Sequence, residues 1–91
     1  MDQAIALLEV QAMVAAFAGL DAMTKTADVK LIHVEKRLGG RLVTVVVTGS
    51  VSAVTAAAQA GAAAAAEVGN VKLCEVIARP HPEVMKFLTT G

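Results

Sequence analysis

The spacing of apolar residues changes its period along the chain, and each period predicts a different kind of element. Residues 29–34 and 42–47 are dominated by β-branched side chains and lie between turn residues, which is typical of strands. Residues 4–10 form an apolar run without regular alternation, which favours a strand buried on both faces. These three runs predict most of a sheet.

A first helix is expected over residues 12–26, where apolar positions recur every three or four residues. Gly19 inside it costs about 1 kcal/mol relative to alanine, so it indicates a neighbouring element pressed against the backbone. The side chains of Asp21 and Lys25 are four residues apart and lie on another side of the helix. The stripe predicted to be buried consists of Met13, Phe17, Leu20 and Met23 or Thr24.

A second helix is expected from residue 51 to about residue 67. Ser50 precedes it and is well placed as an N-cap, because its hydroxyl can accept from the free amides of the first turn. Alanines cover most of this helix, so it has no clearly polar side and is expected to pack closely on its neighbours. Gly69 is the expected left-handed terminator.

The pattern of residues 27–34 is echoed by residues 69–76, and each of these segments follows a helix and predicts a strand. The order strand, helix, strand, loop, strand, helix, strand is typical of the ferredoxin-like βαββαβ kind of α/β sandwich. Because only a helix-length crossover joins parallel strands, both helices should pack on one face of an antiparallel-centred sheet and leave the other for partners. Residues 79–82 break the last strand, and a short C-terminal helix is expected over residues 83–88.

Composition indicates a single domain over residues 1–91 that has too much apolar surface for its size. The net charge of zero and a pI near 6.7 give no electrostatic footprint for nucleic acid. Hydrophobic residues make up 56% of the chain and the mean hydropathy is +0.65, whereas a domain this short buries only about 60–65% of its unfolded surface. The surplus must therefore face either lipid or other protein chains.

Residues 42–66 carry no charge, and this run of 25 residues is long enough to suggest a membrane span. Its period, however, changes from strand to helix at residues 48–50, and a strand joined to a helix cannot satisfy its backbone hydrogen bonds in lipid. No signal peptide is recognisable. Burial against other protein chains, without a membrane, is the expected outcome. The lone Cys74 fits a reducing cytoplasm and a buried, small apolar role.

Candidate chemistry is sparse. Neither His33 nor His81 has a cysteine or carboxylate at ligand spacing, so no metal site is expected. Cys74 has no recognisable base beside it. Gly39 and Gly40 join two strands, which differs from a phosphate-binding loop that leads into a helix. The sequence predicts no catalytic residue, no enzyme activity and no cofactor.

The loop between the two central strands is the most distinctive segment. Within residues 36–42, Gly39 and Gly40 supply the positive φ angles that tight connections require. Arg37 and Arg41 place cations on either side of them. A charged loop tip is typical either of a simply solvated segment or of a binding surface.

Five segments, residues 21–29, 35–41, 42–45, 60–64 and 78–81, together resemble the single-domain shell proteins of bacterial microcompartments. The resemblance spans nearly the whole chain. It implies a cyclic homohexamer that packs edge to edge in the shell of a cytoplasmic protein organelle, with a narrow pore on the six-fold axis. The implied partners are further copies of the chain, other shell proteins, the encapsulated enzymes and the small metabolites that cross the pore.

Transferred by position, the resemblance assigns two groups of residues. The pore-lining residues would be Arg37, Leu38, Gly39, Gly40 and Arg41. The contacts between neighbouring hexamers would be Lys25, Asp28, Arg79, Pro80 and His81. The chain departs from the family pattern at several positions. Its loop is one residue longer than usual, and residues 38–41 replace a commoner Ile-Gly-Ser-Gly type of sequence. Ala12 stands where a glycine is usual, and residues 48–50 replace the usual Arg-Gly-Asp before the second helix while keeping a capping residue at Ser50.

Three functions follow from these observations. The leading hypothesis is a shell hexamer, in which six copies turn each loop arginine into a ring of cations that favours small anionic or polar metabolites. The alternative is an oligomeric ferredoxin-like domain that regulates by binding a small molecule at the loop. An enzyme of the same fold is the weakest hypothesis, since no acid, base or nucleophile cluster is visible.

Overall fold

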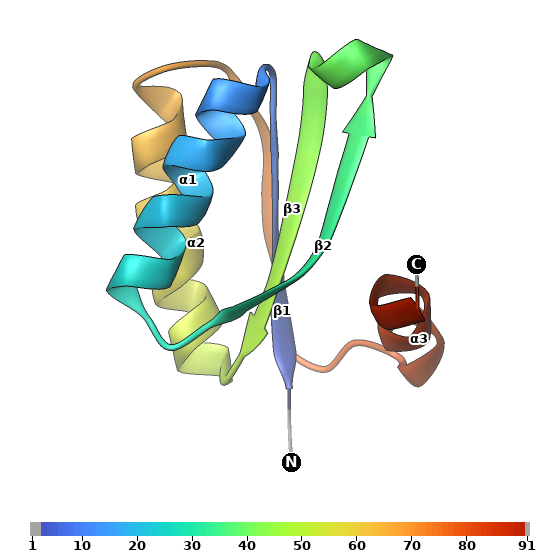
Figure 1. The fold of residues 1–91 in the computed structure, drawn as a ribbon. Helices are drawn as coiled ribbons and strands as arrows, with labels where there is room; N and C mark the ends of the chain where they lie inside the picture. The colour runs from blue at the N-terminus through green and yellow to red at the C-terminus, as the bar shows by residue number, and fades with distance from the viewer. Residues whose placement is uncertain (1–2, 91) are drawn as a thin grey trace.

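Four antiparallel strands form one sheet in the computed structural model, which describes residues 3–90 (Figure 1). The strand order is β2-β3-β1-β4. In chain order the elements are β1 (Ala4–Val10), α1 (Met13–Thr26), β2 (Lys30–Arg37), a 3-10 turn (Leu38–Gly40), β3 (Leu42–Gly49), α2 (Val51–Ala66), β4 (Val71–Ile77) and α3 (Pro82–Thr90).

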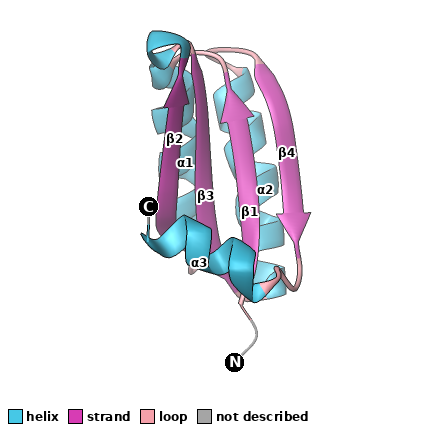
Figure 2. Ribbon diagram, turned by 90° about the vertical axis from the view of Figure 1, so that its right-hand side faces the viewer, coloured by secondary structure: helices cyan, strands magenta, loops and turns pink. Residues whose placement is uncertain are grey.

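The layers agree with the predicted ferredoxin-like sandwich. Helices α1 and α2 lie side by side against one face of the sheet (Figure 1). The short helix α3 crosses one end of the opposite face, which is otherwise uncovered (Figure 2). The fold class is confirmed, including both crossover helices on one face and the C-terminal helix, which begins at Pro82.

The core lies between the sheet and the two long helices. Strand β1 is central, and its side chains are buried on both faces as predicted, with Leu7 and Glu9 half-buried. The helix-facing side of the core contains Ala4, Ala6, Leu8, Val10, Val43, Val45 and Val47 from the sheet, with Ala15, Ala16, Met23, Val54, Ala57, Ala58 and Ala65 from the helices. On the other face a smaller cluster joins Ile5 and Val46 to Leu88 of α3.

The buried side of α1 agrees with the predicted stripe at Met23 and in part at Met13 and Leu20, which pack half-buried against the core, but it differs at Phe17. Phe17 is 63% exposed, and the buried positions of α1 are Ala15, Ala16, Gly19 and Met23. The reason is the close approach of α2, because a Cβ on Gly19 would lie 3.2 Å from the Gly61 carbonyl oxygen. Small residues allow this approach, whereas a phenyl ring would separate the helices. The close neighbour inferred from Gly19 is confirmed.

The two ends of α2 test two further predictions. Ser50 is confirmed as the N-cap, since its Oγ accepts a hydrogen bond from the Ala53 amide at 3.1 Å. The left-handed conformation expected for Gly69 is wrong, because positive φ among the glycines of residues 3–90 is confined to Gly39 and Gly40. Gly69 is instead needed for space, as a Cβ there would lie 2.8 Å from the Gln11 carbonyl oxygen.

Candidate functional site

The turn between β2 and β3 is the first part of the candidate site. Three consecutive residues have positive φ, namely Leu38 at 55°, Gly39 at 67° and Gly40 at 89°. The prediction for the two glycines is confirmed, while Leu38 adopts a conformation that non-glycine residues rarely enter. The Leu38 side chain is 67% exposed, so it projects from the turn into solvent.

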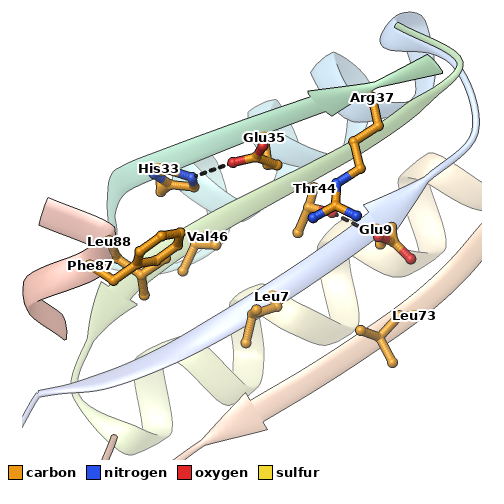
Figure 3. A pocket seen from close by; sticks show the side chains of 10 residues that line it. All are labelled: Leu7, Glu9, His33, Glu35, Arg37, Thr44, Val46, Leu73, Phe87 and Leu88. Carbon is orange, nitrogen blue, oxygen red and sulfur yellow. Dashed lines mark hydrogen bonds and ion pairs between the residues drawn. The ribbon is translucent and has the colours of Figure 1, made fainter. Parts of the chain in front are cut away.

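The two arginines of the turn point in different directions. The Arg41 Nε donates to the Leu38 carbonyl oxygen at 3.2 Å, and this bond folds the side chain back over the turn. The Arg37 side chain extends along the free face of the sheet, and its guanidinium lies beside Thr44 and Glu9 (Figure 3). Within residues 3–90, Arg37 makes no ion pair. Arg41 and Leu38 are therefore the large side chains that remain at the turn itself.

The base of the turn is fastened to the start of α1. The Ala12 amide donates to the Arg41 carbonyl oxygen at 3.3 Å, and the neighbouring Gln11 amide donates to the Asn70 carbonyl oxygen at 2.9 Å. Ala12 has φ 88° and ψ 139°, a backbone conformation that only glycine enters without strain. The position at which the resemblance leads one to expect glycine is thus a strained one in this chain.

A cleft of about 340 Å³ on the free face of the sheet is the second part of the site (Figure 3). Its polar side chains are mostly paired, because Thr44 Oγ1 donates to Glu9 Oε2 and His33 Nε2 lies opposite Glu35 Oε1, both at 3.0 Å. The apolar lining consists of Leu7, Val46, Leu73, Phe87 and Leu88. Arg37 closes the end nearest the turn.

Sequence reasoning did not find this cleft. Glu9 and Thr44 were its signal, because each is a polar residue within an apolar strand, and they are partners in the register of β1 with β3. The contribution of α3 depends on how the chain folds back after β4. The Phe87 ring lies 5.9 Å from the His33 ring, at an interplanar angle of 44°.

The residues assigned to the edge lie on two segments away from the turn. The C-terminal end of α1 and the segment after β4 both lie at the end of the molecule opposite the turn (Figure 1). Lys25 pairs with Asp21 at 2.9 Å on the surface of α1. His81 Nδ1 accepts from the Glu83 amide at 3.1 Å and so caps the start of α3. Asp28, Arg79 and His81 are exposed, and Pro80 is half-buried.

Groups that could perform chemistry are scarce. Among residues 3–90, no three His, Cys, Asp or Glu side chains gather closely enough to hold a metal ion. No helix in the same range is long and apolar enough to cross a membrane. Burial, with a smaller contribution from Glu75, raises the pKa of the Cys74 thiol, which donates to the Ala58 carbonyl oxygen at 3.5 Å. A raised pKa disfavours the thiolate, so Cys74 is not a reactive nucleophile.

The described residues form a small α/β sandwich with large apolar side chains on its surface and a cationic turn, features that favour contacts with other protein chains. The comparisons agree, since the family model for the BMC domain matches residues 4–80. The chain belongs to the BMC domain family, the shell proteins of bacterial microcompartments.

Named relatives cover nearly the whole chain. The bacterial microcompartment shell protein PduA of Citrobacter freundii is 49% identical over 89 residues, which are 98% of this chain and 95% of the relative. EutM of Escherichia coli, also a microcompartment shell protein, is 42% identical over 98% of this chain and 91% of its own. The carboxysome shell protein CsoS1C of Hydrogenovibrio crunogenus is 44% identical, covering 97% of this chain and 86% of its own.

A solved structure gives the same answer for the fold. The crystal structure of a microcompartment protein from Desulfitobacterium hafniense superposes with a TM-score of 0.86 at 27% sequence identity. The match covers all of this chain but 49% of that one, so this chain spans about half its length. The predictions of a structural shell protein, of no enzyme activity and of a place in the microcompartment shell are confirmed by this family membership.

Proposed function

We propose that the chain forms a cyclic homohexamer that tiles the facets of a bacterial microcompartment and leaves a pore at its centre. The observation that carries this proposal is the apolar surface of the single chain. Large apolar side chains are exposed on both sides of the sandwich, whereas monomeric domains rarely leave so many together. They are Val14, Phe17, Leu31, Val34, Leu38, Val51, Val68, Leu73, Ile77, Val84 and Phe87.

The shape of the molecule supports a radial arrangement. Its longest dimension is 35 Å, with the cationic turn at one end and the predicted edge residues at the other (Figure 1). In a ring with the turns at the axis, Lys25, Asp28 and the 79–81 segment would lie on the perimeter. Pore and edge would then be formed by opposite ends of the same chain.

The pore would favour small anionic metabolites. Six copies of Arg41 near the axis form a cationic collar, and charged rings of this kind set the selectivity of many pores. Leu38 would add an apolar ring beside it, and Gly39 and Gly40 would keep the opening free of further side chains. Because the Arg37 side chain extends over the sheet, its charge would act on the electrostatic potential around the pore entrance more than at the narrowest point of the pore.

Anion binding on the axis tests the pore. Crystals of the wild-type hexamer soaked in bromide should show anomalous density on the six-fold axis beside Arg41. The Arg41→Gln variant should lose this density while the Arg37→Gln variant keeps it. Bromide absent from the axis of the wild type, or retained in the Arg41→Gln hexamer, would contradict the assignment of Arg41.

Tiling is tested separately from ring formation. Concentrated wild-type protein should form hexagonal sheets or tubes visible by electron microscopy. Lys25→Ala should abolish the sheets and leave hexamers, because a lysine on the perimeter contributes to contacts between tiles. Lys72→Ala is the matched control, since Lys72 is an exposed lysine on β4 outside the proposed edge. Loss of the hexamer itself in Lys25→Ala would show that the edge assignment is wrong.

Other shell proteins and the encapsulated enzymes are the further partners of such a tile. The alternative of a small-molecule regulator draws no support from the relatives, which are shell proteins by name. The same electron microscopy separates the two functions, because a regulator that only oligomerises would form no sheets.

A further inference from the structure

Both aromatic side chains of the chain are on its surface. Phe17 of α1 is 63% exposed and Phe87 of α3 is 66% exposed, and the sequence contains no Tyr or Trp. Aromatic side chains bury large apolar areas and normally belong to a core or an interface. The core of this chain is filled by Ala, Val, Ile, Leu and Met. Both phenyl rings can therefore contact another molecule.

Phe17 projects from the helical side of the molecule. The buried side of α1 carries Ala15 and Gly19, and Phe17 points away from both of them. Val14, one turn earlier, is 66% exposed. The two residues form an apolar protrusion on the outer surface of α1.

The cleft lies on the other side of the same molecule. Helices α1 and α2 cover one face of the sheet, and the cleft opens on the opposite face (Figures 1 and 3). Leu7, Val46 and Leu73 form its apolar floor, and Phe87 stands at its wall. Its volume of about 340 Å³ is at the small end of the range for organic ligands, about 300–1,000 Å³. A cleft of this size suits one aromatic side chain together with the residues beside it.

We propose that Phe17 of one copy fills this cleft on the next copy of the ring. This inference rests on the proposed hexamer and names the surfaces that close it. A contact between two different patches on opposite sides of a chain is heterologous, and such contacts generate closed rings when the rotation between neighbouring copies closes. The incoming ring meets Phe87 in the edge-to-face or offset geometry that aromatic pairs prefer.

The polar rim of the cleft permits this burial. Glu9 already accepts a hydrogen bond from Thr44, and Glu35 lies 3.0 Å from His33, so covering them leaves no carboxylate without a partner. A small polar metabolite would instead need unpaired groups to hold it in place. Arg37, which makes no ion pair within residues 3–90, lies at the end of the cleft and not over its apolar floor.

Truncation of Phe17 tests the contact energetically. Phe17→Ala should raise the subunit concentration at which hexamers form by about 30-fold or more, as expected for a central aromatic anchor, and Phe17→Leu should restore much of the loss. Val51→Ala, which shortens an exposed apolar side chain at the start of α2, is the matched control and should change assembly little. Circular dichroism should show that all three variants keep the wild-type fold.

Photo-crosslinking tests the contact geometrically. A benzoylphenylalanine at position 17 should crosslink between chains, and mass spectrometry should locate the link at Leu7, Leu73 or the 84–88 segment. Mixed light and heavy isotope-labelled chains establish that the link is intermolecular. Links to α1 or α2 of the neighbour would overturn the proposal, as would a link only to a copurifying protein or small molecule.

The two proposals fail in different ways. If Phe17→Ala forms hexamers at the same subunit concentration as the wild type, the assigned contact is wrong and the proposal of a shell tile stands. A wild-type chain that never forms hexamers removes the tile and the contact together.

Discussion

Replacement of Ala12 by glycine should stabilise the protein. Ala12 has φ 88° and ψ 139°, and a non-glycine residue held in such a region costs on the order of 1–3 kcal/mol. The hydrogen bond from the Ala12 amide to the Arg41 carbonyl oxygen, and the one from Ala16 to the Ala12 carbonyl oxygen, hold the strained conformation in place. Glycine adopts the same angles without strain and keeps both bonds.

The net gain is smaller than the strain. Glycine adds conformational freedom to the unfolded chain, which costs about 0.4–1 kcal/mol. The remaining stabilisation is about 0.5–2 kcal/mol, and one kcal/mol shifts the melting temperature of a domain this size by about 4–8 °C. A rise of about 2–16 °C is therefore expected for Ala12→Gly.

Thermal and urea unfolding, followed by circular dichroism at one fixed subunit concentration, measure this gain without a contribution from mass action. Ala63→Gly is the matched control, because Ala63 is exposed in the middle of α2, where glycine costs about 1 kcal/mol. The reasoning predicts opposite signs for the two variants. A destabilised Ala12→Gly protein would refute the claim that this position is strained.

Three further predictions concern single positions. Gly69→Ala should lower the unfolding free energy by about 1–3 kcal/mol in urea titrations, since its Cβ would meet the Gln11 carbonyl oxygen at 2.8 Å. Ser50→Ala should cost about 1 kcal/mol in the same titration through loss of the hydrogen bond from the Ala53 amide, and Ser50→Asp should restore it. Cys74 should react with iodoacetamide more slowly in the folded than in the urea-unfolded chain, because burial raises its pKa. The same raised pKa predicts that stability falls at alkaline pH, where the unfolded thiol ionises first; a Cys74→Ser variant should weaken this dependence.

The sequence was sufficient for the order of the elements and for the layer that the helices form. The apolar run of residues 4–10 located β1 with its observed bounds, Ala4–Val10, and the cap at Ser50 marked the start of α2. These signals depend on residues that are close in the sequence, so tertiary contacts did not change the predictions made from them. The ends of β2 and β3 lie two or three residues further than expected, because strand pairing continues to Arg37 and to Gly49.

The rest depends on contacts between distant residues. Helical spacing placed Phe17 on the buried stripe, but the approach of Gly61 selects small residues for that side and turns Phe17 outward. Gly69 is required by the closeness of Gln11, which no local pattern reveals. The cleft combines three strands with α3, so only the folded chain brings Phe87 beside His33. The roles of the turn in a pore and of Lys25 at an edge remain predictions, since they require several copies.

The number of copies in the assembly tests the account most directly. Sedimentation equilibrium of the purified chain at micromolar concentration should give one species of six times the chain mass, because six copies bury the apolar surface that one leaves exposed. A folded, soluble monomer at that concentration would contradict the ring, and with it the central pore and the tiled shell.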